Sequence, residues 1–203
     1  MLLEIDALEE AVRAFEAALV VSADDGEALA GLGRALMRLD KPKEALDRLR
    51  QAARARPEDA DTQKAFAGAC LVGSEHDEAA QALLVVVRLR PEDGEARLML
   101  AEAFQGVGKW RESLEAIDQA GLQGRSARAA YLRGRAHEAA GRPEDAAAAY
   151  REAVEKDRRL ADAHLQLARI LEKQGAFEDA ATSFEAVVKL EAHDADVLVA
   201  LAR

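Results

Sequence analysis

Residues 26–59 read GEALAGLGRALMRLDKPKEALDRLRQAARARPED, and this stretch decides the fold. Its first half carries Leu29, Leu32, Leu36 and Leu39, which recur at steps of three and four residues. That spacing places the four leucines on one face of an amphipathic helix.

A second helix is predicted after a turn at Asp40–Pro42, because the first turn of a helix tolerates a proline. Ala45 and Leu49 belong to its apolar stripe. Pro57 ends the stretch, since the residue before a proline is driven out of the helical region. We therefore expect a pair of helices that cross where small residues such as Ala45 let the backbones approach.

This pair recurs along the chain. A small residue follows an acidic residue at Ala11, Ala45, Ala79, Ser113, Ala146 and Ala180, at intervals of 34, 34, 34, 33 and 34 residues. A large side chain lies four residues after each, at Phe15, Leu49, Leu83, Ile117, Tyr150 and Phe184. Gly108, Gly141 and Gly175 lie five residues before the small residue of their units. A fixed period of this length is the signature of a repeat protein.

The unit resembles the tetratricopeptide repeat. The residues that carry the resemblance in the first complete unit are Leu29, Leu32, Gly33, Ala35, Ala45, Leu49, Ala52 and Pro57. The resemblance covers nearly the whole chain and implies an all-α fold, an α-solenoid in which antiparallel helix pairs stack into a right-handed superhelix.

We expect a single solenoid over residues 1–203. Complete units are expected at 26–59, 60–93, 94–126, 127–160 and 161–194, with only a second helix in 1–25 and a truncated first helix in 195–203. Terminal repeats normally carry a polar cap, and neither end has one. We therefore expect the chain to be a piece of a longer protein or to have its ends covered by a partner.

The unit at 94–126 differs from the others: it is one residue shorter and lacks the closing proline. Gly121 and Gly124 lie close to the expected end of its second helix and predict that this helix terminates early. We expect a change of superhelix pitch, or a weaker joint, at this place.

The stretch GVGKWRES at 106–113 could suggest a phosphate-binding loop. Such a loop requires G-x-x-x-x-G-K-[ST] after a strand, whereas Trp110 follows Lys109 here and no strand is predicted before it. Gly108 occupies the column of Gly141 and Gly175, so we interpret it as a turn residue.

No other residues suggest catalysis, a metal site or a cofactor. His76, His137, His164 and His193 are not at metal-ligand spacing. His137 and Cys70 share a column with leucines and are interpreted as core or half-buried residues. We therefore predict a protein that is not an enzyme.

Charge and hydropathy disfavour two further classes of protein, those that bind nucleic acid and those that span a membrane. The chain carries 38 acidic against 28 basic residues, for a net charge of −10, which disfavours nucleic acid as a partner. The longest strongly apolar run, Leu83–Val87, is far shorter than a membrane span. A signal peptide is not evident, so we expect a cytoplasmic protein, with the periplasm left open for a piece of a longer secreted chain. The excess of arginine over lysine and the lack of asparagine suggest a bacterial source.

In the resembled family the first helices line a concave groove. Transferring its groove positions onto this chain predicts ten partner-binding residues: Arg34, Arg38, Lys64, Leu71, Leu98, Arg128, Tyr131, Arg135, Leu165 and Arg169. The leucines and Tyr131 are expected as exposed apolar contacts. The alternative is that the basic residues merely pair with neighbouring carboxylates.

The resemblance implies a non-catalytic module that binds a protein or peptide with apolar anchors and some acidic residues in the groove. Two alternatives stay open: a scaffold that self-assembles through its uncapped ends, and the recognition arm of a larger protein. Bacterial relatives often serve as adaptors in motility, secretion or pilus assembly. Binding of a chaperone tail is disfavoured, because Lys64 is accompanied by Gly68 where that subset of the family has asparagine.

Overall fold

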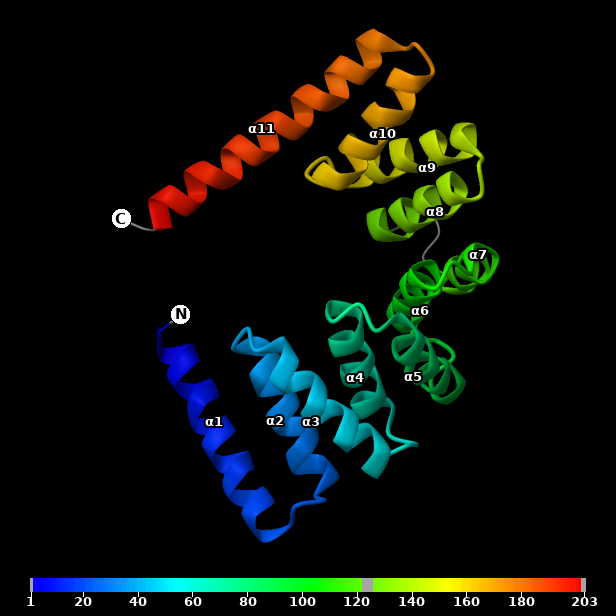
Figure 1. Cartoon of the computed structure of the whole chain (residues 1–203). Coiled ribbons are helices and arrows are strands. Elements are labelled where there is room, and N and C mark those ends of the chain that lie inside the picture. The colour runs from blue at the N-terminus through cyan, green and yellow to red at the C-terminus, as the bar shows by residue number, and fades with distance from the viewer. Residues whose placement is uncertain (1, 122–125, 202–203) are drawn as a thin grey trace. The chain divides into compact units, whose positions relative to one another are not determined.

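The computed structural model describes residues 2–121 and 126–201, with side chains described for 5–121 and 126–192. Within these ranges every regular element is an α-helix (Figure 1). The helices form two compact units, Met1–Lys109 and Trp110–Arg203. The division falls inside the unusual unit at 94–126, at the turn between its two helices.

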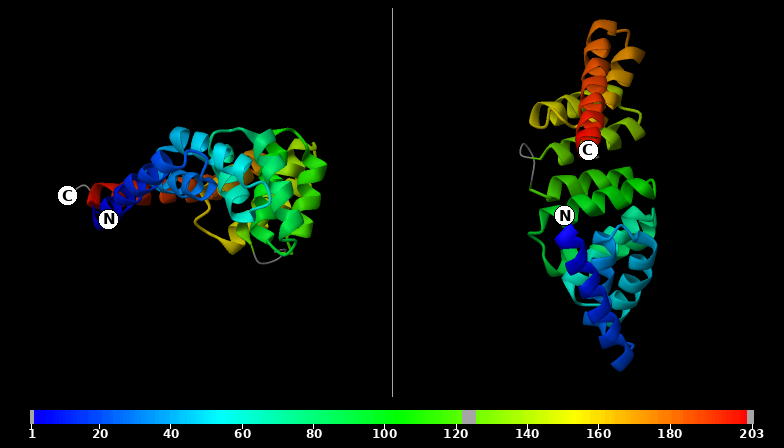
Figure 2. Two further views of the ribbon diagram at one scale, coloured as in Figure 1. Left: turned by 90° about the horizontal axis from the view of Figure 1, so that it is seen from below. Right: turned by 90° about the vertical axis from the view of Figure 1, so that its left-hand side faces the viewer.

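Each unit is built from consecutive helices that pack on one another. The first contains α1 (Leu2–Val21), α2 (Gly26–Arg38), α3 (Pro42–Ala55), α4 (Ala60–Val72), α5 (His76–Leu89) and α6 (Gly94–Gly106). The second contains α7 (Trp110–Gln119), α8 (Ala127–Ala139), α9 (Pro143–Lys156), α10 (Ala161–Lys173) and α11 (Phe177–Leu201). Within each unit every helix contacts the next, and Figure 2 shows these neighbours side by side from two further directions.

The turns inside the helix pairs share one backbone conformation. The residue at the same place in each repeat has a positive φ: Asp40 (56°), Ser74 (60°), Gly108 (75°), Gly141 (69°) and Gly175 (78°). The amide of the following residue donates to a carbonyl five residues back, as Lys109 N does to Phe104 O at 2.8 Å. This left-handed helix end confirms that GVGKW is a turn.

The first helix of most repeats begins with a side-chain cap. Asp25, Asp59, Asp93 and Ser126 each accept a hydrogen bond from a backbone amide in the first turn, at 2.8–3.2 Å. At the corresponding place in the last repeat, Leu160 provides no side-chain cap. These four caps recur with the repeat and fix where their first helices start.

The core lies where paired helices cross. Ala45, Ala79 and Ala146 are fully buried at the expected crossing positions. The residue that the partner helix presents at the crossing is also small. A Cβ placed on Gly134 would lie 2.5 Å from the Tyr150 ring. Gly33 faces Leu49 in the same way. The predicted close approach of paired helices is therefore confirmed, and glycines contribute to it as well as alanines.

The ends of α7 and α11 test two predictions made from the sequence. The helix α7 ends at Gln119 after 10 residues, and Gly121 follows with φ 65°, which confirms the predicted early end. Gly124 lies outside the described residues. The expected start of a new helix at residue 195 is wrong: α11 runs unbroken to Leu201, because its sequence contains no glycine or proline that would interrupt it.

His137 is half-buried on α8, as predicted. Its Nδ1 is buried without a hydrogen-bond partner among the described residues. Burial lowers the pKa of His137, and Arg142 and Arg133 lower it further, while Asp145 and Asp118 oppose the shift. The folded state therefore takes up a proton at His137 less readily than the unfolded chain does.

We predict that Ser74→Gly raises the free energy of unfolding, and that Gly141→Ser lowers it, each by about 1 kcal/mol. Both residues have positive φ, which a side chain disfavours, and no atom crowds a Cβ at Gly141. Urea unfolding followed by circular dichroism measures the change. Shifts of the same sign for the two substitutions would contradict the shared turn.

We predict that the free energy of unfolding decreases as the pH is lowered below about 6.5, the ordinary pKa of histidine. We expect His137→Leu to reduce this loss. The sign follows from the lowered pKa, because in that range protons bind more to the unfolded chain than to the folded one. Urea unfolding at about pH 7.5 and about pH 5.5 measures the difference. An equal loss in the wild type and in His137→Leu would show that this ring does not contribute.

Candidate partner-binding surface

In the first unit the predicted groove residues lie on the first helices of three repeats. Arg34 and Arg38 lie on α2, Lys64 and Leu71 on α4, and Leu98 on α6. α2 contacts α4 and α4 contacts α6, so these helices lie side by side. The repeat register therefore does bring the predicted residues onto neighbouring helices.

The prediction that Leu98 is an exposed contact is wrong, because its side chain is 0% exposed. Lys64, at the same place in the preceding repeat, is only half-buried. A lysine keeps its charged end in water while its stem is covered, whereas a leucine gains by burying every atom. Leu71 is half-buried, and its neighbour Val72 is more exposed, at 59%.

Lys64 agrees with the alternative interpretation, in which the basic residues pair with neighbouring carboxylates. Its Nζ lies 2.7 Å from Oδ2 of Asp93, whose Oδ1 caps α6 through the amide of Ala96. Burial alone would raise the pKa of Asp93, but the hydrogen bonds from Lys64 and Ala96 bring it below its ordinary value. Lys64 thus links α4 to the cap of α6, and its charge is already paired with a carboxylate.

Arg34 differs from Lys64. It is exposed and forms no ion pair with another residue in the described part of the first unit. Asp61, a carboxylate on which the charge of Arg34 acts, is held by Arg90, with N–O distances of 2.6 and 2.8 Å. The hydrogen bond from Arg90 lowers the pKa of Asp61, and the charge of Arg34 adds to the effect.

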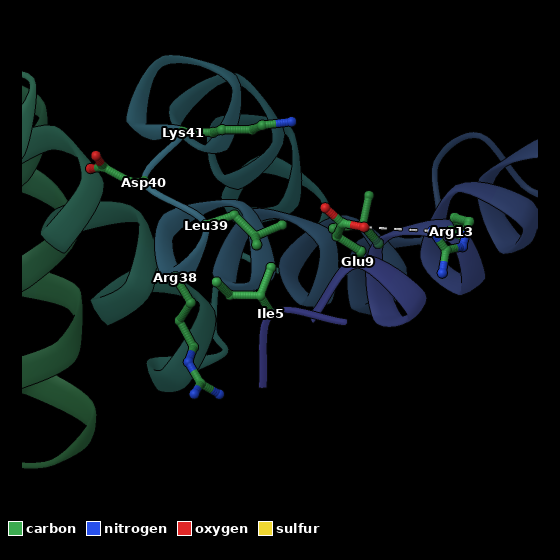
Figure 3. A pocket seen from close by; sticks show the side chains of 8 residues that line it. Ile5, Glu9, Arg13, Arg38, Leu39, Asp40 and Lys41 are labelled. Carbon is green, nitrogen blue, oxygen red and sulfur yellow. Dashed lines mark ion pairs between the residues drawn. The ribbon is translucent and has the colours of Figure 1, made fainter. Parts of the chain in front are cut away.

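Arg38 lies at the edge of the first unit, beside a pocket of about 520 Å³ between α1 and the turn that follows α2. Ile5 and Leu39 point toward each other in this pocket, while the guanidinium of Arg38 points away from them (Figure 3). Glu9 and Arg13 form a loose ion pair at 3.9 Å on its rim. Arg38 and Lys64 therefore belong to different local environments.

In the second unit the remaining predicted residues lie on α8 and α10. Arg128, Tyr131 and Arg135 are half-buried on α8, while Leu165 is half-buried and Arg169 exposed on α10. α9 contacts both helices. Arg135 and Arg169 form no ion pair with any side chain described in this unit.

Two of these predicted residues, Tyr131 and Arg135, line a pocket of about 320 Å³. It is lined by Trp110, Tyr131, Arg135, Glu138, Ala139, Tyr150 and Gln166. These residues come from α7, α8, α9 and α10, all within the second unit. The pocket combines three aromatic rings with one cation and one carboxylate.

Tyr150 fixes the base of this pocket. The side chain is 0% exposed, and its ring lies 5.8 Å from that of Tyr131, tilted by 46°. Its hydroxyl donates to Oε2 of Glu138 at 3.0 Å, from α9 to α8. Burial raises the pKa of the Tyr150 hydroxyl, and the charge of Glu138 raises it further, so the hydroxyl keeps its proton.

Sequence reasoning did not select Trp110, Tyr150 or Gln166 for the site. Tyr150 was visible as the large residue of its column, but that column is otherwise Leu, Ile and Phe. Its hydroxyl was the available signal, since a buried hydroxyl needs a hydrogen-bond partner on a neighbouring helix.

The described residues give little support for a metal site, a reactive thiol or a membrane-spanning helix. They contain no group of three or more His, Cys, Asp or Glu that could hold a metal ion. Cys70 is fully buried, and burial raises the pKa of its thiol to about 12, as expected of an unreactive core residue. No helix in the described part of the chain combines the length and the apolar composition needed to cross a bilayer.

We predict that Tyr150→Phe lowers the free energy of unfolding by about 1 kcal/mol, because it removes a hydrogen bond and leaves the buried ring in place. In a Glu138→Ala background the same substitution should cost much less, since its acceptor is already gone. Urea unfolding of the four proteins measures the coupling. An equal cost in both backgrounds would show that Glu138 does not stabilise Tyr150.

Comparison with known proteins agrees with this architecture. A family model described as tetratricopeptide repeat matches residues 6–48, 31–94 and 98–163, and a second with the same description matches 138–203. The match at 98–163 spans the division between the two units. A search of curated proteins finds no match.

Solved structures with this fold cover most of the chain. MamA (residue 41 to the end) from Desulfovibrio magneticus RS-1 is 22% identical, with 84% of this chain and 97% of that chain covered and a TM-score of 0.70. A tetratricopeptide repeat protein from Parabacteroides merdae ATCC 43184 is 16% identical, with 92% and 75% covered and a TM-score of 0.76. YrrB, described as a TPR protein with an unusual peptide-binding site, is 18% identical, with 95% and 100% covered and a TM-score of 0.64.

The periodic small residues, the repeated left-handed turns and the family models that together extend from residue 6 to residue 203 lead to one conclusion. The fold class is that of an α-solenoid, and the chain belongs to the tetratricopeptide repeat family.

Proposed function

We propose that the chain is a docking module that holds a segment of a partner protein on the face formed by α8 and α10, called here the α8–α10 face. Its contact residues are Tyr131, Arg135, Leu165 and Arg169. The partner segment carries apolar anchors and some carboxylates. Membership of the tetratricopeptide repeat family supports the general class, since this fold is an interaction module.

One observation carries the proposal: Arg135 and Arg169 have no carboxylate partner among the described residues of a chain with 38 acidic side chains. Some other basic residues of the chain are paired, as Lys64 is with Asp93. Each unpaired guanidinium lies on the same helix as a half-buried apolar side chain, Tyr131 or Leu165. Arginine and tyrosine are the residues that most often anchor protein interfaces.

The first unit offers a smaller surface of the same kind. Arg34 is unpaired within its described surroundings, and Leu71 and Val72 leave apolar surface exposed on the neighbouring helix α4. Leu98 adds nothing to it because it is buried. The peptide-binding site noted for YrrB supports peptides as ligands of this fold. We therefore expect a segment bound mainly by the second unit.

Self-assembly through the chain ends is a second candidate with one observation in its favour. Phe177, at the start of α11, is 69% exposed. His76 occupies the same place in an earlier repeat, and its ring covers Gly106 of the next first helix. An assembly that covers Phe177 would make the light-scattering mass rise with concentration, and Phe177→Asp would abolish that rise.

We predict that a peptide selected on the wild-type chain from a random displayed library binds with a Kd on the order of 1 μM. Its Kd should rise at least about tenfold with Arg135→Glu, Arg169→Glu or Tyr131→Ala, since each removes about 1.4 kcal/mol or more. Calorimetry of the synthetic peptide with each purified variant measures this change.

The matched control is Arg151→Glu, an equal charge reversal at an exposed residue on α9. We expect it to change the Kd by less than about twofold, because exposed charges away from an interface contribute little. Selected peptides that bind all variants equally would place the docking surface elsewhere on the chain.

A further inference from the structure

The pocket on the α8–α10 face has walls suited to an aromatic ring. The half-buried rings of Tyr131 and Trp110 line it, and the Tyr131 ring lies 5.8 Å from the fully buried ring of Tyr150. Aromatic rings pack favourably edge to face at such separations. The volume of about 320 Å³ lies at the small end of ligand pockets, so it suits one side chain of a larger segment.

The two charges of the pocket disfavour a charged ligand. Arg135 and Glu138 both line it and are one helical turn apart on α8, yet these two described side chains form no ion pair with each other. A bound cation would lie near Arg135, and a bound carboxylate would lie near Glu138. Either ligand would lose its hydration without a net opposite charge to offset that loss. A neutral group avoids this cost.

The same two charges favour an aromatic ring with a hydrogen-bond donor at its tip. A guanidinium binds the face of an aromatic ring. A carboxylate has about four acceptor positions, and the hydroxyl of Tyr150 occupies one position on Glu138. Glu138 can therefore accept a second hydroxyl while it still holds Tyr150.

We propose that this pocket binds a tyrosine side chain of the partner segment. The ring lies between the aromatic walls, Arg135 covers its face, and its hydroxyl donates to Glu138. The inference rests on the proposed function and gives it a specific anchor, because it assigns which residue of the partner enters the second unit. Ala139, exposed at the rim, leaves the entrance open.

The test uses N-acetyl-tyrosinamide as the probe and Trp110 as the reporter, since the chain has one tryptophan and it lines the pocket. Excitation where tryptophan alone absorbs should give a saturable change with a Kd on the order of 1 mM. N-acetyl-phenylalaninamide should bind about fivefold more weakly, because it lacks the hydroxyl. The amides of N-acetyl-lysine and N-acetyl-glutamate should bind at least about tenfold more weakly.

Two substitutions of the same kind separate the pocket from the rest of the surface. Ala139→Leu fills the entrance and should weaken probe binding at least about tenfold, since it occupies the volume the ring needs. Ala148→Leu, at an exposed position on α9, should leave binding unchanged. If Ala139→Leu alters the fold, Glu138→Ala serves instead, and it should abolish the preference for the tyrosine over the phenylalanine probe.

The proposal is overturned if no saturable change occurs, if a charged probe binds as tightly as the tyrosine probe, or if Ala139→Leu and Ala148→Leu behave alike. Its failure is distinguishable from that of the proposed function. A selected peptide that needs Arg135 and Arg169 while the tyrosine probe fails would leave the α8–α10 face as the docking surface without this anchor. If the tyrosine probe binds but the selected peptide is insensitive to substitution of both arginines, the pocket would still bind tyrosine. The α8–α10 face would then not be the docking surface for the peptide.

Discussion

The structure depends on how closely the two helices of each repeat approach. At Gly134 a single methyl group would collide with the ring of Tyr150, and at Gly33 it would collide with Leu49. At Ala79 and Ala146 a methyl group fills the crossing and is fully buried. Because protein interiors are packed without spare volume, the size of one residue sets the distance between two backbones. A period of 33 or 34 residues repeats that distance along the chain.

The same approach builds the candidate site. Tyr150 lies beneath α8 because Gly134 leaves room for its ring, and from there its hydroxyl reaches Glu138. The ring of Tyr131 then lies 5.8 Å from that ring, tilted by 46°. Tyr150, Tyr131 and Glu138 are therefore positioned by packing and hydrogen bonding within the helix pair before any ligand arrives. A site ordered in advance loses less conformational entropy on binding, which favours affinity from few contacts.

The helix pairs could be predicted from sequence because small and large residues recur in fixed columns. The turn at Gly108 followed from its column, and its φ of 75° agrees. The burial of Leu98 did not follow from its groove position, because a leucine, unlike the lysine at the same place in the preceding repeat, has no polar end to leave in water. The contact of Tyr150 with Glu138 joins two helices, and no spacing within one helix encodes it. The unbroken α11 reflects the lack of any residue that would stop a helix.

Two substitutions that are chemically identical test the central role of the close approach. Both Gly134 and Gly68 lie in the middle of a first helix, but a Cβ at Gly68 would meet only Met99, at an ordinary 3.8 Å. Replacing a helical glycine by alanine normally stabilises by about 1 kcal/mol. In urea unfolding, we expect Gly68→Ala to raise the free energy of unfolding by about that amount, and Gly134→Ala to lower it by about 1–3 kcal/mol through overpacking against Tyr150. A stabilising effect of Gly134→Ala would contradict the account.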